Sequence, residues 1–349
     1  MKKISLLFFI TLFFIFNNDC FSQSLTNSLQ QLSSDVAKSY ISPLISGYGA
    51  DMNSGWVQRV PLPVKVGFNF SAGVVFMGSF LYSAENHFSQ SANLLLSTSQ
   101  ADLMTSQYNN QPLLKQFLMS QLTSSPVPVT VSGATIIGGL KDTVNFYVLP
   151  KTYNYNGQQI TLSGQRFNLG FGGILDNMKV FSMFSPQLTI GTLLGTEVTF
   201  RIVPKSFFAG SNLNHSYCYG IGIQHNPLSY FKHPPPFDLS LGFFYQRLSI
   251  EDVLRSNDMH FGIYAGKTLG SRLFNIALYG GAAYERTSVS LSYTFKNGNQ
   301  QIPISFTVPA DNKFSGVIGL ALKLTLVNIN ADFNFAKYSC VSAGLGIGL

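Results

Sequence analysis

The sequence predicts an all-β protein: a single transmembrane antiparallel barrel of about 12–14 strands, with a short helix and an irregular plug segment ahead of it. Apolar and polar residues alternate along most of the chain from residue 64 onward, which is typical of strands with one apolar face. The alternating stretches are about 9–13 residues long, a length that suits strands crossing a membrane at a tilt. Charged residues make up only 11% of the chain, against about 25% in soluble domains.

The amino terminus has the pattern of a secretory signal peptide. Lys2 and Lys3 precede an apolar run at residues 4–16, and Cys20 and Ser22 flank a plausible cleavage point. The run is too short for a membrane-spanning helix, which needs about 20 apolar residues. We therefore expect residues 1–22 to be removed after export.

Residues 23–63 are predicted to form a short helix followed by an irregular segment. Apolar side chains recur at spacings of three and four, which places them on one helix face: Leu25, Leu29, Leu32, Val36 and Tyr40. Pro43 is expected to end this helix, because proline breaks the helical hydrogen-bond pattern. The stretch YISPLISGYGADMNSGW, residues 40–56, shows no helical or strand period.

The predicted barrel occupies residues 64–349. Its clearest strands are residues 64–76 and 327–335, in which an apolar face alternates with a face of polar residues or glycine. The same alternation predicts strands at residues 167–175, 198–202, 217–223, 239–245, 261–265, 274–284, 289–295, 302–308, 314–324 and 341–349. Gly298, in the sequence NGN, predicts a hairpin turn.

Residues 79–125 form a long excursion with few strand signals. Apolar residues at helical spacing indicate that it is partly helical: Leu113, Leu114, Phe117, Leu118 and Leu122. Long insertions in compact folds are usually functional or mobile. No linker or fixed repeat marks a second domain.

A soluble sandwich is the alternative fold, because a sheet with one face in water alternates in the same way. The number of predicted strands is high for one sandwich, and the last predicted strand runs to the final residue, as in many outer-membrane barrels. A closed barrel pairs its backbone groups between strands and has no edge, so it can face lipid. We expect the outer membrane as the location, its lipid as the surroundings and the outer-membrane insertion machinery as a partner.

Two segments carry a family resemblance. SPLISGYGADMNSGW and GIGIQHNPLSYFKHPPPFDLSLGFFY resemble a family of Gram-negative envelope proteins known only as a domain of unknown function. The layout is also similar, more distantly, to the long-chain fatty-acid transporter family of outer-membrane barrels, in which an N-terminal segment folds inside the barrel as a hatch.

The second resemblance implies that the irregular segment is a hatch, because irregular backbone at membrane depth is tolerated only inside protein or against a water-filled lumen. Gly47, Gly49 and Gly55 would let the chain turn tightly and approach the wall. Asn53 would bond free backbone groups, and Trp56 would anchor the hatch or stand at an aromatic girdle. The alternative is a surface loop that leads into the first strand.

No motif indicates catalysis, a cofactor or a metal. His215, His225 and His233 are spaced by ten and eight residues, which matches no usual ligand pattern. His87 and Ser89 would share a strand face, but no third group completes a catalytic set. We expect a protein that is not an enzyme and has no catalytic, cofactor-binding or metal-binding residues.

The sequence FKHPPPFD, residues 231–238, predicts a rigid turn at a barrel rim. Phe231 and Phe237 flank its prolines and would line an entrance for apolar molecules or anchor in the membrane. The formal net charge of +7 comes from scattered Lys and Arg, which does not favour nucleic acid as a partner.

Two functions remain open. The first is a passive channel or transporter for small molecules, with hydrophobic ones favoured by the family likeness and the many phenylalanines. The second is a barrel that transports nothing and has a structural or partner-binding role, with residues 79–125 as its interaction element. Hatch deletion would distinguish them, because a channel would become leakier and a scaffold would only lose stability.

Overall fold

The computed structural model describes residues 34–64, 66–203, 216–250, 253–271, 273–297 and 300–348. The predicted signal peptide, the leucines ahead of residue 34 and Gly298 lie outside these ranges. Within them, no helix is long and apolar enough to cross a membrane.

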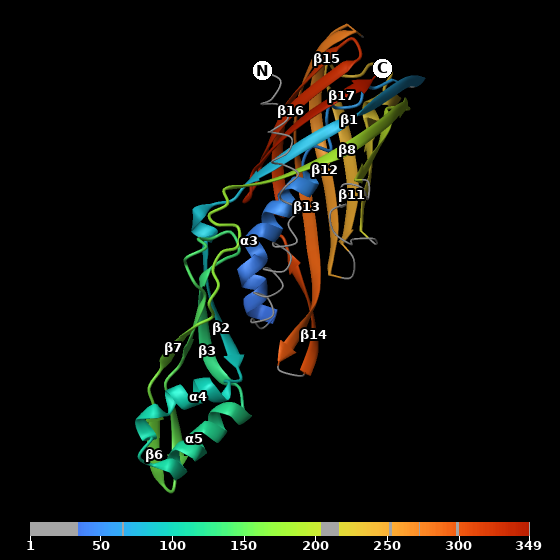
Figure 1. Ribbon diagram of the computed structural model, residues 1–349. Helices are drawn as coiled ribbons and strands as arrows, with labels where there is room; N and C mark the ends of the chain where they lie inside the picture. Colours follow the sequence, from blue (N-terminus) through green and yellow to red (C-terminus); the bar gives the residue numbers. More distant parts are fainter. Residues whose placement is uncertain are drawn as a thin grey trace.

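Ten antiparallel strands form a closed barrel, which confirms the predicted architecture (Figure 1). Each strand pairs with its neighbours in the ring, and the pairing of β12 with β13 closes it. In ring order from β1 the strands are β1 (Val66–Phe80), β8 (Val180–Leu193), β9 (Thr196–Val203), β10 (Tyr217–His225), β11 (Asp238–Ile250), β12 (Leu254–Gly270), β13 (Phe274–Asn297), β15 (Phe314–Leu324), β16 (Val327–Phe335) and β17 (Cys340–Gly348).

The strand faces are those that the alternation predicts. In β1, Phe68 points outward and is 63% exposed, whereas Val75 points inward and is fully buried. In β16, Ile329 and Phe335 are exposed on the outside, while Asn330 and Asp332 are buried on the inside. The outer face is therefore apolar, and much of the lumen is polar.

The predicted number of strands is too high, because the barrel has ten and not 12–14. The stretches at residues 274–284 and 289–295 are one continuous strand, β13, which extends beyond the ring. Residues 302–308 lie in β14 (Gln300–Pro309), which pairs with that extension and not with the wall. Of the predicted strand at residues 167–175, only residues 167 and 168 are in a strand, β7 (Gln165–Asn168), which lies in a separate sheet, and residues 169–175 are in no strand. Alternation of apolar and polar residues shows only that a strand has one buried face. It does not distinguish a strand of the barrel wall from a strand of an outlying sheet.

The N-terminal helix α3 (Ser34–Asn53) is longer than predicted. Pro43 lies inside it, and the stretch predicted to be irregular is helical as far as Asn53. A proline in a helix interior costs about 3 kcal/mol. The wall encloses the second half of α3, where a helix satisfies its backbone groups internally and an irregular chain would leave them unpaired.

The whole connection between β1 and β8, residues 81–179, projects from the barrel (Figure 1). A four-stranded sheet in the order β2 (His87–Leu94), β3 (Val127–Ala134), β4 (Asn145–Val148) and β7 (Gln165–Asn168) forms its stem. A hairpin, β5 (Lys151–Tyr155) and β6 (Gln158–Leu162), lies at the far tip with α4 (Thr98–Met104) and α5 (Pro112–Ser124). Short 3₁₀ turns complete it at η1 (Ser83–Glu85) and η2 (Ser106–Tyr108). We call residues 81–179 the projecting body.

The barrel has two unlike ends. At the short-turn end, tight turns at residues 194–195 and 325–326 join neighbouring strands, only three residues separate β12 from β13, and one longer connection contains η4 (Pro227–Tyr230). Strand β1 also begins there and β17 ends there. The long-loop end carries the projecting body and the extension of β13 with β14.

Candidate functional site

The second half of α3 plugs the mouth of the barrel at the long-loop end. Ser79 of β1 donates a hydrogen bond of 2.9 Å to the backbone oxygen of Gly47. Gly49 faces β13 and the end of β14, where an added Cβ would lie 2.8 Å from Cβ of Ala310 and 3.0 Å from Cβ of Thr287. Only a residue without a side chain lets the helix come this close to the wall.

The end of α3 is fixed by a side chain and by a left-handed residue. Asn53 donates from Nδ2 to the backbone oxygen of Gly49 and to Oγ1 of Thr287 on β13, both at 2.9 Å. Gly55 has φ of +67°, a conformation that favours glycine. Its missing side chain would meet Cγ1 of Val75 at 2.5 Å.

Trp56 lies across the lumen beneath the helix end, held by Arg201 of β9. The guanidinium of Arg201 stacks over the indole, with Cζ 3.9 Å from the ring centroid, and Phe244 packs nearby with its ring centroid at 5.1 Å. The indole Nε1 donates to the backbone oxygen of Met52 at 3.0 Å. A desolvated cation–π contact of this kind contributes about 2 kcal/mol.

Arg201 is fully buried and also binds the carboxyl end of α3. Its Nη2 donates to the oxygen of Ser54 at 2.8 Å and its Nη1 to the oxygen of Met52 at 3.4 Å. Its Nε donates to Oε1 of Gln187 on β8 at 2.9 Å. A cation at a helix carboxyl end also interacts favourably with the helix dipole. One residue of the wall thus holds both the helix end and the tryptophan.

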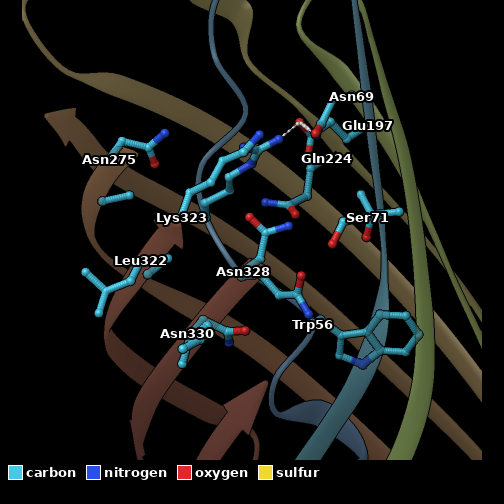
Figure 2. Close-up of a pocket in the computed structure, with 16 residues that line it drawn as sticks. Trp56, Asn69, Ser71, Glu197, Gln224, Asn275, Leu322, Lys323, Asn328 and Asn330 are labelled. Atoms are coloured by element: carbon cyan, nitrogen blue, oxygen red, sulfur yellow. Dashed lines mark hydrogen bonds and ion pairs between the residues drawn. The ribbon is translucent and has the colours of Figure 1, made fainter. Parts of the chain in front are cut away.

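Beyond Trp56, toward the short-turn end, the lumen opens into a polar vestibule (Figure 2). Figure 2 shows the indole at the bottom of the view and Asn69 and Glu197 at the top. The free space is about 580 Å³, including the part open to solvent. Six amide side chains contribute to its lining: Gln58, Asn69, Gln224, Asn275, Asn328 and Asn330.

The charged groups of the vestibule are largely paired with each other. Arg59, on the segment after the plug, lies 3.3 Å from Oε1 of Glu197 on β9. Asn69 of β1 donates to the same oxygen at 2.8 Å. Lys323 of β15 also lines the space. This pairing links the segment after the plug to the wall.

A second polar group lies on the other side of the lumen, around a small cavity lined by Trp56, His260, Asp332 and Asn334. Tyr279 donates to Oδ2 of Asp332 at 3.1 Å, and Asn334 donates to Oδ1 at 2.7 Å. His260 hydrogen-bonds Tyr264. These inward groups of β12, β13 and β16 fix the wall against which the plug rests.

The structure brings together all five predicted hatch residues, Gly47, Gly49, Asn53, Gly55 and Trp56, at or inside the barrel mouth. The predicted rim residues Phe231 and Phe237 lie in the connection between β10 and β11 at the short-turn end, where both are exposed. Neither of them lines the vestibule.

Sequence reasoning missed Arg201, the residue that holds the plug. The signal was present, because Val198, Phe200 and Ile202 form an apolar face and Arg201 lies on the opposite, inward one. An arginine on a predicted lumen face points to a buried partner. The identity of that partner depends on which strands face each other across the lumen.

Comparisons with known proteins give a family and a set of distant barrels. The model of a family described as a family of unknown function, DUF6588, matches residues 1–349. Curated protein sequences give no match.

Among solved structures, the chain is similar to three bacterial proteins. Ail, the attachment invasion locus protein of Yersinia pestis, is 13% identical over 44% of this chain and 93% of its own, with a TM-score of 0.21. The N-terminal β-barrel domain of Pseudomonas aeruginosa OprF is 16% identical over 38% of this chain and 87% of its own, with a TM-score of 0.19. The translocator domain of the autotransporter NalP from Neisseria meningitidis is 11% identical over 90% of this chain and 96% of its own, with a TM-score of 0.24. These scores are low, so the barrel assignment depends on the strand pairing itself.

Proposed function

The chain belongs to DUF6588, a family of unknown function, and we propose that it is an outer-membrane barrel in which α3 acts as a hatch over a polar route for small molecules. The proposal has two parts, the membrane location and the passage, and different observations support them.

The membrane location is supported by an apolar band on the outside of the barrel. Large apolar side chains are exposed on the outer faces of all ten strands, and examples from eight of them are Phe68, Ile190, Ile221, Phe243, Ile263, Leu278, Ile318 and Leu345. An exposed apolar surface this continuous would aggregate in water. Around a closed barrel it suits lipid, because the strand edges are paired.

The passage is supported by the division of the lumen into a plugged part and an open polar part. Trp56 and Arg201 form the boundary, with α3 on one side and the vestibule on the other. This boundary is the main observation in favour of solute passage, because a shift of Trp56 would join the vestibule to the space that α3 fills.

The vestibule favours a small polar solute. Its amide groups can donate to and accept from a solute that gives up its water, whereas an apolar molecule would leave them unpaired. Passage of apolar molecules, as expected from the family likeness, is the competing proposal and would need a route outside this lining.

Conductance across a planar bilayer tests the passage. The native chain should show low conductance, and Trp56→Ala should raise it several-fold because the floor of the vestibule is removed. Phe231→Ala is the matched control, since it removes an exposed aromatic side chain away from the vestibule. Equal conductance of Trp56→Ala and the native chain would contradict the hatch.

Solute entry into liposomes tests the class of molecule. Swelling in a small neutral sugar should be faster with Trp56→Ala than with the native chain. Uptake of a long-chain fatty acid should not change between the two. The reverse pattern would favour the apolar substrate.

A barrel that transports nothing is the second candidate. The observation in its favour is the hold on α3, which is bound to the wall at Gly47, Asn53 and Arg201. In that case Trp56→Ala would lower the thermal stability and leave the bilayer closed.

A further inference from the structure

The first half of α3 lies at the long-loop end, against the projecting body. The backbone N–H of Ile136 donates to the oxygen of Tyr40 at 2.9 Å. The hydroxyl of Tyr40 donates to the oxygen of Gly172, also at 2.9 Å. Tyr40 also meets Phe88 and Phe171 edge to face, with ring centroids 6.3 and 5.7 Å away. These contacts fix the amino-terminal end of α3 outside the ring of strands.

The chain leaves the lumen at the opposite end. Asn226, which follows β10 at the short-turn end, donates from Nδ2 to the oxygen of Pro61 at 2.6 Å. Gly195, in the tight turn between β8 and β9, donates its N–H to the oxygen of Val64 at 3.0 Å. Between these two ends lie Asn53 and Trp56, both buried in the lumen. The segment from Ser34 to Val64 therefore passes lengthwise through the barrel before β1 begins.

The unlike ends give this path a direction. Outer-membrane barrels have short turns on the periplasmic side and longer loops on the outside. Strand β1 begins and β17 ends at the short-turn end, which is then periplasmic. The projecting body, with its own sheet and helices, is attached to the long-loop end.

We infer that the barrel carries part of its own chain across the outer membrane, so that the amino-terminal half of α3 and the projecting body are displayed together at the cell surface. This inference depends on the proposed membrane location but not on solute passage. It gives the lumen a role even where no solute moves, because α3 links the displayed body to the periplasmic end.

The threaded path also limits how the hatch can move. The segment is held by the projecting body at Tyr40 and by the first turn of the wall at Val64. The hatch can therefore shift within the lumen, but it cannot leave into the periplasm while the contacts at Tyr40 persist.

Cysteine labelling of intact cells with a membrane-impermeant maleimide tests the display. Lys38→Cys reports the exposed side of α3, Leu113→Cys reports the projecting body, where Leu113 is 72% exposed, and Leu326→Cys reports the short-turn end. The parent chain gives the baseline; within the described residues its cysteines, Cys218 and Cys340, are buried. We expect strong labelling of Lys38→Cys and Leu113→Cys in intact cells, and of Leu326→Cys only after permeabilisation.

Each other pattern overturns a defined part of the inference. Labelling of Leu113→Cys without Lys38→Cys in intact cells, with both labelled after permeabilisation, would contradict the threaded path. Labelling of Leu326→Cys alone in intact cells would reverse the direction. If carbonate extracts the chain from membranes, the membrane location and the display both fail. A barrel that resists extraction, labels as expected and conducts nothing would refute only the proposed passage.

Discussion

At the scale of single residues, the plug depends on a few buried polar groups. Arg201 is the most important because it contacts the helix end, the indole and the neighbouring strand at once. Burial of an arginine is costly unless its hydrogen-bonding groups are satisfied. Its three nitrogens each have a partner here, so the cost of burial is offset by directed contacts.

Arg201→Met should destabilise the folded barrel by about 2–4 kcal/mol, because it keeps much of the volume but removes the hydrogen bonds and the cation–π contact. Arg201→Lys is the control for charge. Its stability should lie between that of the native chain and that of Arg201→Met, since lysine lacks the planar fork that reaches several acceptors. The midpoint temperature of the heat-dependent gel shift in detergent measures both. If Arg201→Met is as stable as the native chain, Arg201 does not stabilise the plug.

At the scale of elements, α3 shows how packing overrides local preference. Gly49 lowers helix propensity by about 1 kcal/mol relative to alanine. Packing against the end of β14 nevertheless requires glycine, because a Cβ at this position would overlap Ala310. Pro43 likewise lies inside the helix, where local preference would end it.

Gly49→Ala should destabilise the docked helix in spite of its higher helix propensity, since overpacking costs about 1–3 kcal/mol. Gly78→Ala on β1 is the matched control, because the nearest atom to its added Cβ is 3.6 Å away. Thermal midpoints and bilayer conductance of the two variants should be compared. Greater stability of Gly49→Ala would show that the helix is free to move away from β14.

At the scale of the whole molecule, one surface faces lipid and another faces water. The ring of ten strands has an apolar exterior, while the projecting body carries its own buried core, including Leu118, Val131 and Phe146. The barrel therefore has an apolar outer surface suited to lipid, whereas the projecting body buries its apolar residues in a core as a protein in water does.

Ile318→Arg should impair membrane insertion, because an arginine facing lipid near the bilayer centre costs about 2–4 kcal/mol. Ile318 is 59% exposed near the middle of β15. Leu140→Arg is the matched control, since Leu140 is 58% exposed in the projecting body. The fraction of heat-modifiable protein in membranes measures the difference. Equal insertion of the two variants would contradict the lipid-facing band.

The class of fold and the two faces of most strands follow from the order of the amino acids alone. Alternation with period two follows from backbone geometry, so Phe68 and Ile329 are identifiable as outward residues without the structure. The small residues Gly47, Gly49 and Gly55 likewise mark a segment that packs closely against side chains of the surrounding strands.

The number of strands in the ring, the length of α3 and the partners of Arg201 depend on contacts between distant parts of the chain. The periodicity of β14 equals that of a wall strand, and the helix beyond Pro43 persists because the wall surrounds it. The two backbone oxygens that Arg201 binds lie 147 and 149 residues away in the chain. Such contacts arise only when the ring closes, because closure brings β9 against the end of α3 and no local pattern encodes that distance.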